Sequence, residues 1–371
     1  MDNLFKTINP ACCPLPAKDL NKPGFDQDFV SGSIDTPAGK APAVSSRLIL
    51  RDHWGSFKAR WGVGRMDYAI DPGLYALGKP DSKSPVLVSA NYKMSFDRLR
   101  QALPGRDAWI LVLDTDGINV WCAAGKGTFG TDELVRRIEA ARLKDVVGHR
   151  DLVVPQLAGP GVAAHLVKKL SGFTVHWGPI KAADIPAYLD AGYKADSRMR
   201  RKTFTFAERI VLVPIELVHA LKPALIAAPV LFLLGGLGGP AGFWANALNY
   251  GLFAVLAFFS ALIAGTFLNA VLLPYLPGRA FSTKGFFVGF AVAAAVLAAR
   301  GNLHSWPGLI EAFSWLLIVP AFTAYLAMNF TGCSTYTSLS GVKKEMRWAL
   351  PLEAGMAACG MIGWITSRFI S

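Results

Sequence analysis

The pattern of apolar positions divides the chain near residue 210. Before this point charged residues are frequent and apolar runs are short, whereas the later sequence is dominated by apolar stretches long enough to cross a membrane. Those stretches are Ile210–Leu234, Tyr250–Leu273, Gly285–Ala299, Ala312–Met328 and Trp348–Ile365. The pattern predicts a soluble part followed by an all-α membrane domain of about five transmembrane helices.

In the soluble part, short apolar runs alternate with amphipathic stretches. The runs predict strands at residues 85–90, 109–113, 151–154 and 173–177, and a hairpin at 47–63. The amphipathic stretches predict helices at 95–100, 131–143, 161–170 and 181–190. This alternation favours an α/β fold with a doubly wound (Rossmann-like) parallel sheet, in which ligands bind beyond the carboxyl ends of the strands. Those ends fall at residues 89–91, 115–122, 155–161 and 178–179.

Composition adds the expected domain limits. Residues 1–45 are rich in Pro, Gly, Ser and Lys, which is typical of a flexible N-terminal arm. The α/β domain is expected at 46–195, a basic juxtamembrane linker at 196–209 and the transmembrane domain at 210–371. Residues 1–21 lack the apolar core of a signal peptide.

We attribute the net charge of +12 to contact with a membrane and not to binding of nucleic acid. A basic cluster directly precedes the first span and is typical of an anchor on the cytoplasmic side, beside anionic lipid. It consists of Lys194, Arg198, Arg200, Arg201 and Lys202. The same side of the membrane would carry Arg279, Lys284, Lys343, Lys344 and Arg347, and the other side only Arg300 and Arg368. The asymmetry predicts a multi-pass protein of the inner membrane, with a cytoplasmic soluble domain and an external C-terminus.

Several ionisable residues lie in or beside the predicted spans. Such groups are costly in a membrane and often functional, although pairing at the rim of a span is an equally simple explanation. They are Glu216, His219, Lys222, Glu311 and Glu353.

The five cysteines include no C-x-x-C pair, so no iron–sulfur or zinc site of the usual spacing can be formed. They are Cys12, Cys13, Cys122, Cys333 and Cys359. The adjacent thiols of Cys12 and Cys13 are either incidental or a capture site for a soft metal ion such as Hg(II).

Cys122 stands in a distinctive local context. The apolar run 109–113 and the turn Asp114–Gly117 precede it, Asn119 is a good helix N-cap and Gly125 a natural helix stop. This predicts one to two turns of helix with Cys122 in the first turn. The helix start and Lys126, one turn away, favour a thiolate, which is a soft ligand for a transition metal. On local physics alone, a small core cysteine remains the ordinary alternative.

The octet around Cys122 resembles, position for position, the cap-helix signature of the mercury-methylating corrinoid protein family. It comprises Asn119, Val120, Trp121, Cys122, Ala123, Ala124, Gly125 and Lys126. The resemblance implies a cobalamin-type corrinoid cofactor that these residues bind, with Cys122 as the lower axial ligand of cobalt. A weaker likeness, to the corrinoid domain of corrinoid iron–sulfur methyl carriers, adds further cofactor-binding candidates, for each of which ordinary turn chemistry is the alternative. These are Asn91, Gln156, Gly159 and Gly161.

The first resemblance implies a corrinoid-dependent methyltransferase that carries a methyl group on cobalt and transfers it to inorganic Hg(II), giving methylmercury. Hg(II) is an electrophile and needs a carbanion-like or radical methyl group, which an electron-rich thiolate on the opposite face of the cobalt favours. The implied partners are a folate-type methyl donor system and a two-cluster [4Fe-4S] ferredoxin-type reductant. The chain departs from the iron–sulfur carriers here, because it lacks cluster cysteines of its own.

Two other functions remain open at this stage. One is a corrinoid methyl carrier of one-carbon metabolism, with mercury methylation as a side reaction. The other is a membrane transporter with a cytoplasmic regulatory domain. Turnover with different acceptors separates the first, and a corrinoid absorbance would argue against the second.

Overall fold

The computed structural model describes residues 22–239, 241–301, 304–330 and 339–370. Two compact units make up the chain. The first contains residues up to 57 and 64–202, and the second contains 58–63 and the residues from 203 onward. The division agrees with the change of hydrophobic pattern near residue 210. Each unit is described by itself below.

Seven strands in the described part of the first unit form one mixed sheet. They are β1 (Val30–Thr36), β2 (Gly39–Val44), β3 (Gly73–Leu77), β4 (Val86–Ala90), β5 (Ala108–Leu113), β6 (Asp151–Val154) and β7 (Thr174–Trp177), in the spatial order β1-β2-β3-β5-β4-β6-β7. Strands β5, β4, β6 and β7 are parallel, whereas β3 is antiparallel to β5 and β1 to β2. The parallel sheet expected from the sequence is therefore only part of a mixed sheet.

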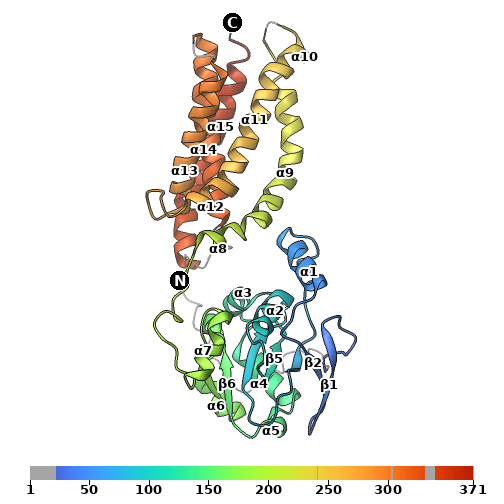
Figure 1. Cartoon of the computed structure of the whole chain (residues 1–371). Helices are drawn as coiled ribbons and strands as arrows, with labels where there is room; N and C mark the ends of the chain where they lie inside the picture. The colour runs from blue at the N-terminus through green and yellow to red at the C-terminus, as the bar shows by residue number, and fades with distance from the viewer. Residues whose placement is uncertain (1–21, 240, 302–303, 331–338, 371) are drawn as a thin grey trace, which may run out of the picture. The chain divides into compact units, whose positions relative to one another are not determined.

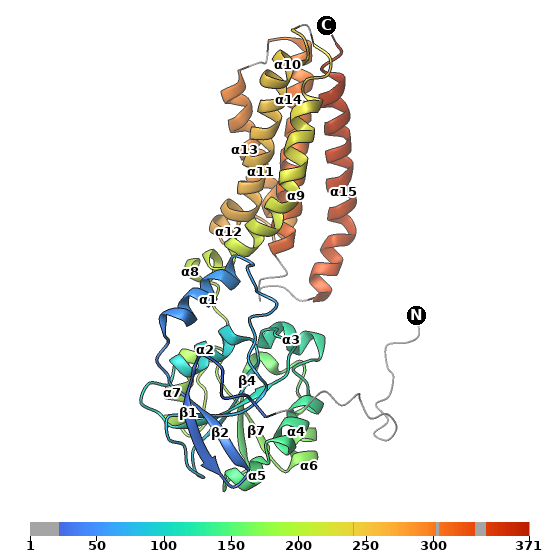
Figure 2. The ribbon, with the colours of Figure 1, turned by 90° about the vertical axis from the view of Figure 1, so that its right-hand side faces the viewer.

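Helices cover both faces of the parallel strands. Alternate residues of β5 enter separate cores, with Trp109, Leu111 and Leu113 on one face and Ile110 and Val112 on the other. The first core also receives α4 (Thr131–Ala140) and α6 (Ala164–Ser171), and the second receives α2 (Lys93–Gln101) and α7 (Ile185–Asp190). Figure 2 shows the sheet between these two pairs of helices.

The strand order reverses between β4 and β6. From β4 the chain passes through α2 to β5 on one side, and later through α6 from β6 to β7 on the other. A crevice at the carboxyl ends of neighbouring strands is expected at such a reversal, and it is where open α/β sheets bind ligands. The loops after β4, β5 and β6 all meet at this end. Short α3 (Val120–Lys126), α5 (Leu143–Val146), η1 (Gln156–Ala158) and η2 (Ala182–Asp184) complete the connections.

Two predictions for the N-terminal region were wrong. Residues 30–44, expected in a flexible arm, form β1 and β2 at the edge of the sheet, where Gly, Pro and Lys are common. The hairpin expected at 47–63 is instead α1 (Leu50–Arg60) followed by a turn. No strand was predicted from the sequence at β3. The expected strands of the parallel part lie within two residues of β4, β5, β6 and β7. Cys12 and Cys13 lie outside the described residues.

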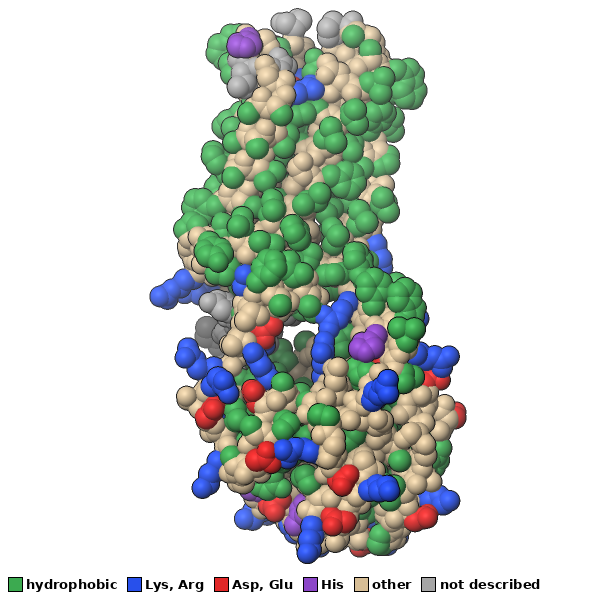
Figure 3. All heavy atoms as spheres, in the orientation of Figure 1, with side chains coloured by type: hydrophobic (Ala, Val, Ile, Leu, Met, Phe, Trp, Pro, Cys, Tyr) green, Lys and Arg blue, Asp and Glu red, His purple; other side chains and the backbone are tan. Residues whose placement is uncertain are grey.

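In the described part of the second unit, five helices are long and apolar enough to cross a membrane, as predicted (Figure 1). They are Phe206–Leu234, Phe243–Leu272, Phe281–Arg300, Trp306–Asn329 and Gly341–Thr366. Their parts are α8 (Phe206–Ile210) with α9 (Val213–Leu234); α10 (Phe243–Asn246), η3 (Ala247–Gly251), α11 (Leu252–Ile263), η4 (Ala264–Leu268) and α12 (Asn269–Leu272); α13 (Phe281–Arg300); α14 (Trp306–Asn329); and α15 (Leu339–Thr366). Hydrophobic side chains cover the visible outer surface of this unit (Figure 3).

Small residues let the helices of this unit approach closely. Gly285 and Gly289, four residues apart on α13, face α14. A Cβ on Gly285 would lie 2.8 Å from Ala324 Cα, and one on Gly289 would lie 2.7 Å from Pro320 Cα. Because apolar surface gains nothing by leaving lipid, such close backbone packing is a main source of helix association in membranes.

Candidate functional site

The short helix α3 carries Cys122 as its third residue, in the first turn as predicted. The Asn119 side chain is its N-cap and accepts a hydrogen bond from the Cys122 backbone N–H, with 3.0 Å between Oδ1 and N. The helix ends two residues later than expected. Gly127, not Gly125, takes the left-handed conformation that closes it, with φ of 87°.

The two faces of α3 differ in burial. Ala123 and Ala124 are buried against the sheet, whereas Cys122 is half-buried and Gly125 and Lys126 are exposed. A Cβ built on Gly125 meets no atom within 4 Å. With about 100° per residue, Cys122, Gly125 and Lys126 share one side of the helix. The structure therefore presents the thiol on a small, open surface beside a glycine, and not in the core.

Asn91 lies beneath the loop that leads to α3. Its side chain is buried, and its Oδ1 accepts hydrogen bonds from Thr115 N at 3.0 Å, Thr115 Oγ1 at 2.8 Å and Gly117 N at 3.0 Å. The amide oxygen is fully used by these bonds. Asn91 thus fixes the turn after β5 that positions the cap helix.

Glu133, which no sequence motif marks, supports the same loop. Its Oε1 accepts from Asp114 N at 2.9 Å, and its carboxylate is paired with Arg136 and Arg137. Glu133 lies in the first turn of α4, where an acidic residue is common. Its sequence position therefore gave no sign of a link to the loop.

The loop after β6 packs directly on α3. A Cβ on Gly161 would overlap the Phe129 carbonyl oxygen and lie 3.2 Å from Ala124 Cα. The Gly161 carbonyl accepts from Thr131 N at 3.2 Å. Only glycine permits this approach, so Gly161 has a structural reason that sequence alone did not reveal. Gly159 is exposed in the same loop.

Arg200 joins the loops after β6 and β7. Its Nη1 donates to Gln156 Oε1 at 2.8 Å and to the Gly178 carbonyl at 3.1 Å. The sequence placed Arg200 in a basic juxtamembrane cluster and Gln156 among the cofactor contacts. The structure instead pairs the two side chains, a link between distant residues that no local spacing signals.

A buried network of charges ties α1 to α2. Lys93 Nζ lies 2.7 Å from Asp52 Oδ1 and 2.6 Å from Asp97 Oδ1, and Arg100 contacts the same two carboxylates at 2.6 and 2.8 Å. Burial alone would raise the pKa of the Asp52 carboxyl, but the Lys93 hydrogen bond, the Ile49 amide and the charges of Lys93 and Arg100 lower that pKa below its ordinary value.

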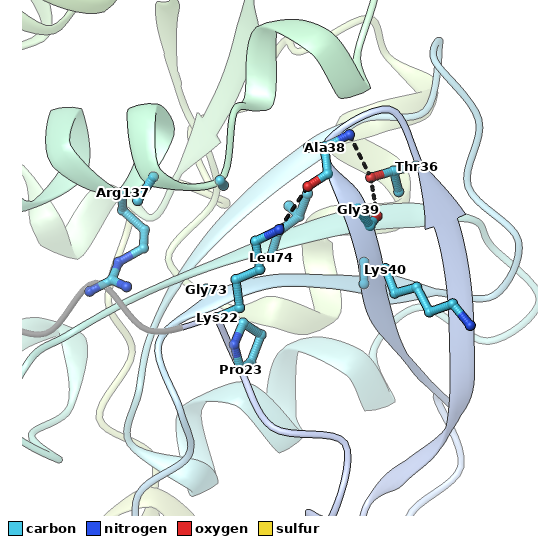
Figure 4. A pocket seen from close by; sticks show the side chains of 12 residues that line it. Lys22, Pro23, Thr36, Ala38, Gly39, Lys40, Gly73, Leu74 and Arg137 are labelled. Carbon is cyan, nitrogen blue, oxygen red and sulfur yellow. Dashed lines mark hydrogen bonds between the residues drawn. The ribbon is translucent and has the colours of Figure 1, made fainter.

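A small pocket in this unit lies away from α3. Figure 4 shows it between the β1–β2 turn, the start of β3 and α4. Its polar groups bond one another, since Lys22 Nζ donates to the Ala38 carbonyl at 2.8 Å and Thr36 Oγ1 to the Gly39 carbonyl at 2.5 Å. We assign it no role.

The ionisable residues of the second unit differ in their surroundings. Glu311 is buried, with its carboxylate oxygens 3.6 Å from Arg300 Nη2 and Arg368 Nη2. Glu353 is also buried, Glu216 is half-buried and His219 is exposed. Pairing thus accounts for Glu311.

Comparison with known proteins gives matches over about a third of the chain. Residues 64–189 match the family model described as CO dehydrogenase/acetyl-CoA synthase delta subunit. The gamma subunit of the acetyl-CoA decarbonylase/synthase complex of Methanopyrus kandleri is 33% identical over 126 residues, covering 33% of this chain and 26% of that protein. The gamma subunits of Methanosarcina acetivorans and Methanothermobacter thermautotrophicus are 32% and 30% identical over 133 and 128 residues, covering 35% and 34% of this chain and 28% of each protein. The chain is thus similar in this part to subunits of that complex, and spans about a quarter of the length of these curated relatives.

Proposed function

We propose that the α/β unit is a Rossmann-like corrinoid-binding domain and that the chain is a membrane-bound, corrinoid-dependent methyltransferase. The observation that carries the proposal is α3, which follows β5 and presents the half-buried Cys122 thiol at the carboxyl end of the parallel strands, the end where a reversal of strand order between β4 and β6 favours ligand binding. The similarity of residues 64–189 to acetyl-CoA synthase subunits supports it.

The residues present fit such a cofactor. One thiol is enough as an axial ligand when a macrocycle fills the other positions of the metal. The open space beside Gly125 leaves room for a flat ring to approach the helix backbone. A bound corrinoid would supply a cobalt centre that accepts and releases a methyl group.

The chain's own residues would then have distinct roles. Cys122 would be the lower axial ligand, held in place by the Asn119 cap and by Ala123 and Ala124 packed beneath it. Val120, Trp121, Gly125 and Lys126 would contact the ring or its edge. We assign Asn91, Gln156 and Gly161 to positioning the loops, because their contacts are within the protein.

Inorganic Hg(II) is the acceptor that we propose, on the strength of the octet. A thiolate ligand favours release of the methyl group to an electrophile, which distinguishes this site from one that serves a nucleophilic acceptor. The partners would be a folate-type methyl donor system and a two-cluster [4Fe-4S] ferredoxin-type reductant. A methyl carrier of one-carbon metabolism is the second candidate, favoured by the similarity to the gamma subunits.

The test begins with an absorbance spectrum of the full-length protein purified from cells that make corrinoids. We expect a corrinoid spectrum, which Cys122→Ala should shift, because the axial ligand is lost, while mercury methylation falls by at least about a hundredfold. Cys359→Ala is the matched control, since this exposed thiol lies on α15 in the second unit. It should leave both readouts unchanged.

Retention of the wild-type spectrum and of methylation in a folded Cys122→Ala protein would falsify the ligand assignment. The same assay separates the two candidate functions. Repeated turnover with Hg(II) should require an added low-potential reductant, whereas faster turnover with a thiol or nickel acceptor would favour the one-carbon carrier.

A further inference from the structure

Helix α1 and the residue after it carry a stripe of large apolar side chains that are at least partly exposed. The exposed fractions of its side chains are 85% for Leu50, 58% for Trp54 and 49% for Phe57. Trp61, the residue directly after the helix, is 38% exposed. These positions are spaced by four, three and four residues, so they fall within about 60° of one helix side. The Trp54 and Phe57 rings stack with centroids 5.3 Å apart.

The opposite side of α1 is buried. Asp52 and Ala59, seven residues apart, are its buried positions. Asp52 is fixed by Lys93 and Arg100 on α2. The network therefore sets the rotation of the helix about its own axis, and it points the stripe outward.

Basic side chains flank the stripe on both edges. Lys58 and Arg51, which also pairs with Asp28 at the surface, lie about 80–100° to one side of it. His53 and Arg60 lie about as far to the other side. An aromatic and aliphatic centre between edges that carry Arg and Lys is the pattern of a helix that lies in the headgroup region of an anionic membrane. Figure 3 shows hydrophobic side chains gathered at the surface over α1.

The segment after α1 also has exposed apolar side chains, as expected beside a membrane. Val63 and Met66 are 60% and 70% exposed. Residues 58–63 group with the transmembrane unit, in which a Cβ on Gly62 would lie 3.2 Å from Ile215 Cδ1, at the start of α9. The end of α1 thus groups with the unit that contains the five apolar helices.

We propose that α1 is an interfacial helix whose Leu50–Trp61 stripe inserts into the headgroup region of a bilayer rich in anionic lipid. Its function is to attach the α/β unit to the membrane surface. The charge pattern selects anionic lipid as the occupant. The proposal is independent of the corrinoid and of the methyl acceptor.

The experiment uses the full-length chain reconstituted in vesicles of phosphatidylcholine and phosphatidylglycerol. The photoreactive amino acid p-benzoylphenylalanine replaces Phe57, which keeps an aromatic ring at that position, and mass spectrometry identifies the adducts formed on illumination. We expect lipid adducts. The matched control has the same replacement at Leu170, an exposed apolar residue on α6, and should give none.

A second arm tests the charged edges. Arg51→Gln with Lys58→Gln should lower the lipid adduct yield at position 57 severalfold, because each basic side chain near an anionic surface contributes a factor of roughly five to binding. Vesicles of phosphatidylcholine alone should have the same effect. Adducts confined to another protein chain, or to the chain's own transmembrane helices, would overturn the proposal, as would equal lipid adducts at positions 57 and 170.

Discussion

At the residue scale, substitutions of Gly125 test most directly whether this surface of α3 binds a ligand. It lies inside α3, where glycine is less favourable than alanine by about 1 kcal/mol, and a Cβ there meets nothing. Gly125→Ala should therefore stabilise the protein slightly in the absence of corrinoid. Gly125→Leu should fold as well but retain less corrinoid after purification, because its side chain would fill the space beside Cys122.

The measurement is the ratio of corrinoid absorbance to protein, together with the unfolding temperature. Gly32→Leu is the matched control, since a Cβ on this exposed strand residue also meets nothing within 4 Å. It should keep full corrinoid content. A Gly125→Leu protein with undiminished corrinoid would mean that no ring approaches this face of α3.

The residues of the candidate site were only partly predictable from the sequence. Cys122 and its N-cap Asn119 were predictable, because a cap and its helix are adjacent in the chain. The roles of Asn91 and Arg200 were not, since their hydrogen-bond partners are 24 and 44 residues away. The role of Glu133 was not predictable either, because its partner, the Asp114 amide, is 19 residues away. Long-range hydrogen bonds leave no periodic trace that a sequence pattern could reveal.

At the element scale, the attachment of α1 depends on Asp52. Replacing it with Asn removes one charge from a buried network of two cations and two carboxylates, leaving the excess positive charge uncompensated. Loss of one partner in such a network costs roughly 3 kcal/mol. Asp52→Asn should therefore weaken hydrogen-exchange protection of α1 and α2 by that free energy.

Asp28→Asn is the control, because Asp28 pairs with Arg51 at the surface, where an ion pair contributes less than about 1 kcal/mol. The pH dependence has a defined sign. The folded-state pKa of Asp52 is lowered, so its contribution is complete above the ordinary carboxyl pKa of about 4 and is lost as pH falls through the lower folded value. Protection factors of α1 should decline below about pH 4 in the wild type, and less so in Asp52→Asn.

The contact of α13 with α14 gives a prediction for the membrane part. Gly289→Leu should lower the unfolding temperature in detergent, because its Cβ would fall 2.7 Å from Pro320 Cα and 2.8 Å from Thr323 Cβ. Overpacking of this kind costs typically 1–3 kcal/mol. Gly355→Leu on α15, where nothing lies within 4 Å, should change the unfolding temperature little. Equal effects of the two substitutions would contradict the close contact.

Elements were predictable where a single period dominated. The mostly buried strands β4, β5 and β6, the half-buried strand β7 and the long apolar helices had such signals. The hairpin prediction for residues 47–63 was wrong because Gly55 and the aromatic residues favour a hairpin. The charges that anchor the segment as helix α1 are on α2. Strands β1 and β2 have the composition of a loop, and the pairing of β1 with β2 and of β2 with β3 decides their structure.

At the scale of the whole molecule, we expect each of the five apolar helices to cross the membrane, which would put the two ends of the second unit on opposite sides of it. The basic residues before the first helix, and those at 279–284 and 343–347, would then share one side, which the positive-inside rule predicts to be cytoplasmic. Reporter fusions after Ser371 and within residues 235–242 should both report the external side. A fusion within residues 273–280 should report the cytoplasm.

A cytoplasmic signal after Ser371 would mean that one helix does not cross, and α13, the shortest at 20 residues, is the first to suspect. The external result would place the α/β unit, the candidate corrinoid site and any reductant that serves it in the same compartment.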